Sequence, residues 1–237
     1  MQVGLFIPCY VDQFYPKVAI ATLEVLEAQG CEVIYPVKQT CCGQPLANSG
    51  YGNHTHGIET LFRKNFEGCE YIVCPSGSCT LHSKEHILDE GAQIYELTEF
   101  LIDVIKTPII SATFPYKVGL HQSCHGLRGL RVAKSSELNI EAFDKPAKLL
   151  NQVADIDLIT VGQPDECCGF GGTFAIAEEA LSIKMGKDRI DDHVEHEVDV
   201  ITGGDMSCLM HLEGLIKRDG KKIKVMHIAE ILNGAEL

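Results

Sequence analysis

Short apolar segments alternate with stretches of helical periodicity along the first part of the chain. Short apolar runs bounded by turn residues are typical of buried strands, whereas longer periodic stretches are typical of helices. The predicted strands are Val3–Ile7, Glu32–Tyr35, Tyr71–Val73 and a short segment before Thr98. The predicted helices are Lys17–Gln29, Gly57–Phe66, a segment that begins near Cys79, and Thr98–Ile105.

The same alternation returns in the second part of the chain. The predicted strands there are Lys117–Leu120, Asp157–Val161 and Val198–Thr202, and the predicted helices are Ser136–Val153, Ala175–Ile190 and Cys208–Lys217. Strands that alternate with helices favour parallel sheets with helices on their faces. We therefore expect an α/β protein made of three-layer αβα units with mostly parallel sheets.

The chain contains an internal repeat, in which four landmarks recur in the same order. The recurring pairs are Val3-Gly4-Leu5 with Val118-Gly119-Leu120, Cys41-Cys42-Gly43 with Cys167-Cys168-Gly169, Ser78-Cys79 with Ser207-Cys208, and Glu99-Phe100-Leu101 with Glu230-Ile231-Leu232. The offset between the copies grows only from 115 to 131 along the chain. One duplication followed by small loop insertions explains this growth, and we expect the two halves to be related by a pseudo-twofold axis.

A connector separates the two copies. The segment from Lys106 to Pro115 contains two prolines, which interrupt helices and mark linkers. We place the boundary near residue 110, which gives a first cysteine-rich half at 1–110 and a second at 111–237.

Charge and hydrophobicity exclude several classes of function. The chain has 33 acidic and 20 basic residues and a formal net charge of −13, which disfavours a nucleic-acid surface. No apolar run approaches the roughly 20 residues that a transmembrane helix needs. We recognise no secretory leader before the first strand. We therefore expect a cytoplasmic protein with no transmembrane segment and no nucleic-acid partner.

Eleven cysteines are many for a chain of 237 residues. In a reducing compartment, cysteines at ordered positions are more typical of metal ligands or reactive thiols than of disulfides. Four recur in each half, each after a predicted strand, so they are expected at the carboxyl edge of a parallel sheet, where ligands bind. These are Cys9, Cys41, Cys42 and Cys79 in the first half and Cys124, Cys167, Cys168 and Cys208 in the second.

Four thiolates suit an iron–sulfur cluster, and equally a tetrahedral zinc ion. The adjacent cysteine pair favours a cluster with several irons, because neighbouring side chains rarely both point at one small ion. A glycine follows each pair, Gly43 and Gly169, and is expected to take a positive φ beside a bulky centre. The chain lacks a ferredoxin-type cysteine run, a dinucleotide fingerprint and a Walker loop, so we expect it to depend on partners for those functions.

At these residues the chain resembles the cysteine-rich CCG family, which includes the cysteine-rich component of heterodisulfide reductase, and most of all its lactate-utilisation branch. The family pattern is a cysteine, Cys-Cys-Gly after thirty-odd residues, and a final Cys-x-x-Cys; here 31 residues separate Cys9 from Cys41 and 36 separate Cys42 from Cys79. The resemblance implies an iron–sulfur subunit, most simply with [4Fe–4S] centres, of a cytoplasmic L-lactate oxidation complex. It implies the eight repeated cysteines as ligands, and a ferredoxin-type subunit and a third small subunit as partners. It also implies no activity of the chain alone.

The chain departs from the reductase pattern at its end. His82 and His211 stand where the reductase has a second cysteine, and a histidine three residues on lies on the same helix face and can replace that ligand. This change weakens a first alternative, a disulfide-reducing enzyme of the heterodisulfide reductase type. A second alternative is a zinc-binding structural module.

Other candidate residues are weaker. His121 and His125 flank Cys124, but histidines in loops are usually solvated. Cys31 and Cys69 are expected in the core, and Cys74 is a further candidate thiolate. Three acidic residues are expected on an exposed helix face: Asp191, Asp192 and Glu195.

Overall fold

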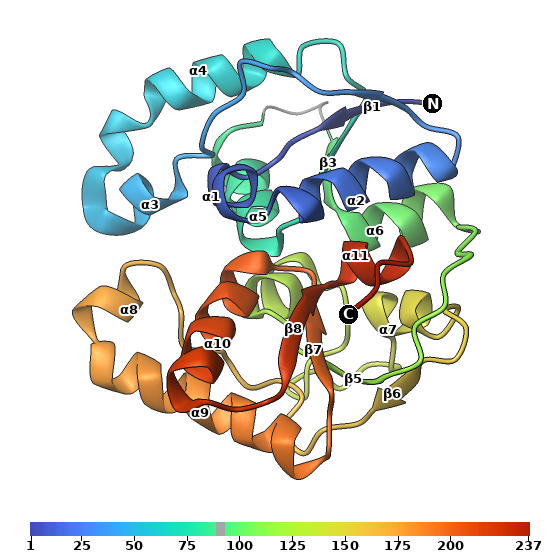
Figure 1. Ribbon diagram of the computed structural model, residues 1–237. Coiled ribbons are helices and arrows are strands. Elements are labelled where there is room, and N and C mark those ends of the chain that lie inside the picture. The colour runs from blue at the N-terminus through green and yellow to red at the C-terminus, as the bar shows by residue number, and fades with distance from the viewer. Residues whose placement is uncertain (89–92) are drawn as a thin grey trace. The chain divides into compact units, whose positions relative to one another are not determined.

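The computed structural model describes residues 1–88 and 93–237 of the chain. They form two compact units, Met1–Ile109 and Ile110–Leu237 (Figure 1), and each unit has its own four-stranded sheet. The pseudo-twofold axis between them stays a prediction.

The strands of both sheets are parallel throughout, which confirms the predicted α/β class. The first sheet has the order β2-β1-β3-β4, and the second has the equivalent order β6-β5-β7-β8. The strands are β1 Gln2–Leu5, β2 Glu32–Ile34, β3 Tyr71–Cys74, β4 Gln93–Glu96, β5 Lys117–Leu120, β6 Asp157–Ile159, β7 Val200–Gly203 and β8 Lys224–His227.

Helices flank each sheet. Those of the first half are α1 Cys9–Phe14, α2 Pro16–Ala28, α3 Gln44–Leu46, α4 His56–Asn65, α5 Gly77–His86 and α6 Leu97–Phe100, with irregular helical turns η1 Ala47–Tyr51, η2 Gly52–His54 and η3 Leu101–Ile105. Those of the second half are η4 His125–Leu130, α7 Lys145–Leu150, α8 Phe174–Ala177, α9 Glu179–Glu195, α10 Met206–Asp219 and α11 Ile228–Leu232. None of the helices in the described residues is long and apolar enough to cross a membrane.

The helix predicted over Ser136–Val153 is wrong for its first half. Only α7, Lys145–Leu150, is helical there, and the segment before it is irregular. Asp144 caps the helix by accepting a hydrogen bond from Ala147 N at 2.8 Å. Pro146 fits only in a first turn, because it has no N–H to donate to an earlier carbonyl. The Asp144 cap and the position of Pro146 therefore explain why the helix begins only at Lys145.

Strand order determines where a ligand can bind in each half. From β1 the chain passes to β2 on one side, and then to β3 on the other side of β1. The connections after neighbouring strands β1 and β3 therefore leave the sheet in opposite directions, and this divergence opens a crevice outside the strands' carboxyl ends. The equivalent position in the second half lies beyond β5 and β7.

Glu96 ends β4 and caps α6. Its Oε2 accepts hydrogen bonds from Thr98 N at 2.8 Å and from Glu99 N at 3.3 Å, and the Glu99 side chain accepts from Glu96 N in return. The carboxyl group is buried, and burial raises the pKa of Glu96 from its ordinary value of 4.5 to about 7.

Replacing Glu96 with Gln is expected to remove part of the pH dependence of stability. Because the raised pKa makes the folded protein bind the proton more tightly than the unfolded chain, the stabilisation is complete below pH 4.5 and is lost as the pH rises through about 7. At ~1.4 kcal/mol per pKa unit, the free energy of unfolding falls by about 3 kcal/mol across this window. Urea denaturation of Glu96→Gln at several pH values should lack this fall.

The exposed Glu67 provides the matched control. Glu67→Gln should keep the wild-type fall in stability. If Glu96→Gln also keeps it, the Glu96 carboxyl ionises in the folded protein as it does in water, and the proposed effect of burial is wrong.

Candidate metal centres

The four repeated cysteines of the first half meet at the carboxyl edge of its sheet. Cys9 begins α1 after β1, Cys41 and Cys42 follow β2, and Cys79 lies in the first turn of α5 after β3. The Cys42 and Cys79 Sγ atoms are 3.6 Å apart. The Cys41 thiol interacts by hydrogen bonds with both Cys9 and Cys42. The fold thus joins four thiols from three segments into one chain of contacts.

The second half repeats this arrangement. Cys167 interacts by hydrogen bonds with Cys124 and Cys168, and Cys168 interacts in turn with Cys208 in the first turn of α10. A ring nitrogen of His121 joins the group, because it and the Sγ atoms of Cys168 and Cys208 all lie within 4.8 Å of one another. Both groups run from a more exposed cysteine, Cys9 or Cys124, to buried ones.

The glycine after each cysteine pair shapes the turn. Gly43 has φ +89° and Gly169 has φ +85°, which confirms the predicted positive φ. This conformation turns the glycine N–H back toward the first cysteine of the pair, so that Gly43 N donates to Cys41 Sγ and Gly169 N donates to Cys167 Sγ, each at 3.4 Å. These amides stabilise negative charge on sulfur.

Crowding sets the protonation of the thiols. Hydrogen bonds from Cys42 and Cys9 lower the pKa of Cys41 to about 2. The same hydrogen bonds, with burial, raise the pKa of Cys9 and of Cys42 well above the ordinary range. The second half shows the same pattern: the pKa of Cys167 is lowered to about 2, and the pKa values of Cys124 and Cys168 are raised. Sulfur atoms this close can all ionise only if a cation lies among them.

This donor set fits a soft metal centre. Thiolates bind zinc, copper(I) and iron–sulfur clusters, and the first-turn positions of Cys79 and Cys208 add the favourable field of a helix N-terminus. Main-chain amides that point at sulfur are also available, since Phe170 N donates to Cys168 Sγ at 3.5 Å. Both halves therefore have the chemistry of a metal site.

His82 and His211, which stand where the reductase pattern has a second cysteine, lie beside the two groups of thiols. His82 is buried, interacts with the main chain of Cys42 and lies against His86, with ring centroids 4.9 Å apart and the rings tilted at 49°. His211 Nε2 lies 3.4 Å from the Ser182 carbonyl oxygen, to which it can donate a hydrogen bond.

Of the weaker cysteine candidates, two lie in the core as predicted, and the role of Cys74 as a thiolate stays a prediction. Cys31 and Cys69 are buried core residues. Cys74 ends β3, fully buried, and its thiol contacts the Ser76 carbonyl oxygen at 3.8 Å. The equivalent residue at the end of β7 is Gly203, where a Cβ atom would lie only 2.7 Å from the His121 carbonyl oxygen.

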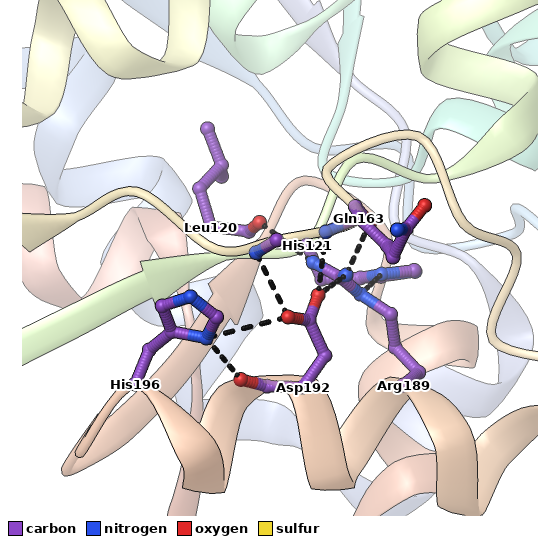
Figure 2. A network of polar contacts seen from close by, with 7 residues as sticks. Leu120, His121, Gln163, Arg189, Asp192 and His196 are labelled. Atoms are coloured by element: carbon purple, nitrogen blue, oxygen red, sulfur yellow. Dashed lines mark hydrogen bonds and ion pairs between the residues drawn. The ribbon is translucent and has the colours of Figure 1, made fainter.

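Three polar residues lie behind the second group, of which sequence reasoning missed Arg189 and placed His121 and Asp192 in solvent. His121 was expected in solvent but is 2% exposed, and burial, followed by the nearby Arg189 charge, lowers its pKa to about 3. Arg189 has no exposed side-chain surface and pairs with Asp192 at 2.8 Å (Figure 2). The prediction that Asp192 lies on an exposed helix face is wrong, because this ion pair turns it inward; Asp191 and Glu195 are exposed as predicted.

Comparison with known proteins shows which family the chain belongs to. The chain matches the CCG cysteine-rich domain family twice, over residues 3–84 and 118–213. It is 39% identical to lactate utilization protein A of an Exiguobacterium species, over 98% of this chain and 96% of that protein. The proteins of the same name from Oceanobacillus iheyensis and Geobacillus kaustophilus are 41% and 39% identical, over 98% of this chain and 97% and 99% of theirs. Among solved structures, a glutamate racemase of Bacillus anthracis aligns with a TM-score of 0.37 at 12% identity over 98% of this chain and 78% of that one, which is too little to carry an argument.

Gly169 offers a direct test of the turn geometry. A Cβ atom on Gly169 would lie 2.6 Å from the Ser182 carbonyl oxygen and 2.8 Å from Met185 Cβ. Gly169→Ala should therefore lower the free energy of unfolding by about 2–4 kcal/mol, from steric overlap added to the cost of a left-handed conformation. Chemical denaturation measures this loss.

Gly172 is the matched control, because it also has a positive φ, +61°, but no atom lies within 4 Å of its added Cβ. Gly172→Ala should lower stability by only about 1–2 kcal/mol, the conformational part alone. Equal losses in the two variants would mean that the Cys-Cys-Gly turn is not packed against α9.

Proposed function

This chain belongs to the family of proteins with the CCG cysteine-rich domain, and we propose that it is the iron–sulfur subunit of a complex that oxidises L-lactate. The observation that carries the proposal is the meeting of four thiols at the carboxyl edge of each sheet. The name of the relatives, lactate utilization protein A, supports the lactate part of the proposal.

We assign the eight repeated cysteines as ligands, one set of four in each half. Two features favour an iron–sulfur cluster over zinc. Each half presents two adjacent cysteines, which suit a centre larger than a single ion, and main-chain amides point at their sulfur atoms. A cluster, when bound, supplies one-electron transfer, and its potential depends on such hydrogen bonds.

The duplication fits the chemistry of lactate. Oxidation of L-lactate to pyruvate releases two electrons and two protons, and two one-electron centres together accept two electrons. The sequence contains no nucleotide fingerprint and no ferredoxin-type run, and we therefore place the immediate electron donor or acceptor on another subunit. We propose a ferredoxin-type subunit and a third small subunit as these partners. Cys9, the most exposed of the first set, marks the side from which one centre is reached.

Protein purified without air is expected to contain iron and acid-labile sulfide and to absorb broadly near 400 nm. Replacing Cys168 with Ser should remove about half of both, because each half uses its own four thiolates. Metal analysis and sulfide determination of the wild type and Cys168→Ser measure this. Cys42→Ser should give the same half loss from the other set.

Cys31→Ser is the control, since Cys31 is a buried cysteine outside both sets; it should retain all the iron. If the wild-type protein contains stoichiometric zinc and no sulfide, the iron–sulfur assignment is wrong and the protein is a zinc-binding module. Loss of all metal in Cys168→Ser alone would mean that the eight cysteines form one shared site.

We expect the isolated chain to form no pyruvate from L-lactate with NAD or any other nicotinamide acceptor. Activity should appear when the chain is purified together with a ferredoxin-type subunit, because a buried centre needs another centre within tunnelling reach to turn over. Pyruvate formation by the chain alone and by the reconstituted complex provides the comparison. Rapid lactate oxidation by the chain alone would contradict the assignment as a subunit.

A further inference from the structure

The two halves differ at one position beside the candidate metal centres. Phe6 follows β1, and its N–H donates to Val73 O at 2.9 Å; His121 follows β5, and its N–H donates to Thr202 O at 2.7 Å. The strand registers are equivalent, since Leu5 pairs with Val73 as Leu120 pairs with Thr202. Phe6 and His121 therefore occupy the same place in the two copies.

The surroundings of this position have changed with it. In the first half the ring of Phe6 packs edge-on against the rings of Phe62, in α4, and Phe66, directly after α4. The ring centroids are 4.8 and 5.9 Å apart. This aromatic group packs in one buried cluster with Cys42 and Cys79. The first centre is therefore backed by hydrocarbon.

In the second half the corresponding residues are polar. A Cβ on Gly4 would meet Phe66, and a Cβ on its counterpart Gly119 would meet His193, which identifies His193 with Phe66. One helical turn earlier, Arg189 of α9 takes the place of Phe62. A buried arginine and two buried histidines thus replace three phenylalanine rings.

Hydrogen bonds fix Arg189 on every side, as Figure 2 shows. Its Nη1 donates to Asp192 Oδ2 at 2.8 Å and to the Gln163 carbonyl oxygen, and its Nη2 donates to the Leu120 carbonyl oxygen at 3.3 Å. The Asp192 carboxylate accepts further hydrogen bonds from the main-chain N–H groups of Gly162 and Gln163. The Arg189 Nε–H then donates to His121 Nδ1 at 3.3 Å.

This last hydrogen bond determines which nitrogen of His121 carries a proton. Arginine has donors and no acceptor, so Nδ1 of His121 must present its lone pair to Arg189. In the neutral ring the proton then lies on Nε2, which is buried and has no hydrogen-bond partner among residues 1–88 and 93–237. The sulfur atoms of Cys168 and Cys208 lie within 4.8 Å of a nitrogen of this ring.

We propose that His121 donates its Nε2–H to the thiolates of the second centre, with Arg189 as the positioning residue, whereas Phe6 at the equivalent position of the first half has no N–H to donate from its ring. This inference rests on the proposed function in one respect only, the presence of a cluster. It assigns His121 a role other than metal ligand, because a nitrogen that carries a proton has no lone pair to offer a metal.

Inequality of the two centres follows from this arrangement. A reduced cluster carries one more negative charge than an oxidised one, and an N–H donor at its sulfur stabilises that charge. The second centre should therefore have the higher reduction potential, since hydrocarbon backs the first.

Two measurements on the protein as purified without air test this. Nitrogen-15 NMR of the histidine rings in the oxidised protein is expected to show His121 as the neutral Nε2–H tautomer, assigned by its loss in His121→Phe. Redox titration followed by electron paramagnetic resonance should resolve two midpoint potentials in the wild type. His121→Phe, which copies the first half, should move only the higher one to a more negative value.

Two further variants separate positioning from folding. Arg189→Lys keeps a positive charge beside Asp192 but loses the Nε–H group that donates to His121. It should therefore also move the higher midpoint potential to a more negative value. His193→Phe copies the neighbouring position of the first half and should move neither potential. If Arg189→Lys does not fold, the pair His121→Phe and His193→Phe still decides the question.

The proposal is overturned if the proton of His121 lies on Nδ1, or if pulsed resonance detects iron bound directly to a histidine nitrogen. It is also overturned if folded, fully iron-loaded His121→Phe keeps both wild-type potentials. A protein without iron would contradict the proposed function instead, and the NMR measurement would still decide the tautomer of His121.

Discussion

Four sulfur atoms held together at the end of one parallel sheet cannot all be negatively charged unless a cation lies among them. In each half, hydrogen bonds from the neighbouring thiols favour the charged form of one cysteine, Cys41 or Cys167. That thiolate in turn disfavours ionisation of the thiols beside it. A metal centre removes this conflict, because it binds all four in their charged form. The strand order, the glycine turns and the first helical turns that contain Cys79 and Cys208 all serve to bring these sulfur atoms together.

Much of this could be predicted from the sequence, because the relevant signals are local. The cysteines recur with their glycines, and each follows an apolar strand, so the repeat alone predicts both sheets and both thiol groups. The late start of α7 was missed because a helical pattern of apolar residues outweighed the cap and proline at Asp144 and Pro146. The burial of Arg189 and Asp192 could not be predicted, because nothing local marks these residues as buried. Their partners, Leu120 and Gln163, lie far away in the sequence.

The two halves share the same backbone scaffold but differ in the buried side chains that pack beside the second group of thiols. The strand pairing and the Cys-Cys-Gly turn are the same in both halves, while Phe6 and Phe62 are replaced by His121 and Arg189. A buried arginine is tolerated only where its donors find acceptors, and four of the five N–H groups of Arg189 do so, on His121, Gln163, Asp192 and Leu120.

Anomalous diffraction at the iron absorption edge, from crystals grown without air, tests the central claim most directly. The account predicts two separate iron peaks, one among Cys9, Cys41, Cys42 and Cys79, and one among Cys124, Cys167, Cys168 and Cys208. The second peak should lie beside His121 without a bond to its ring. A single peak shared by both sets, or peaks that appear only at the zinc edge, would contradict it.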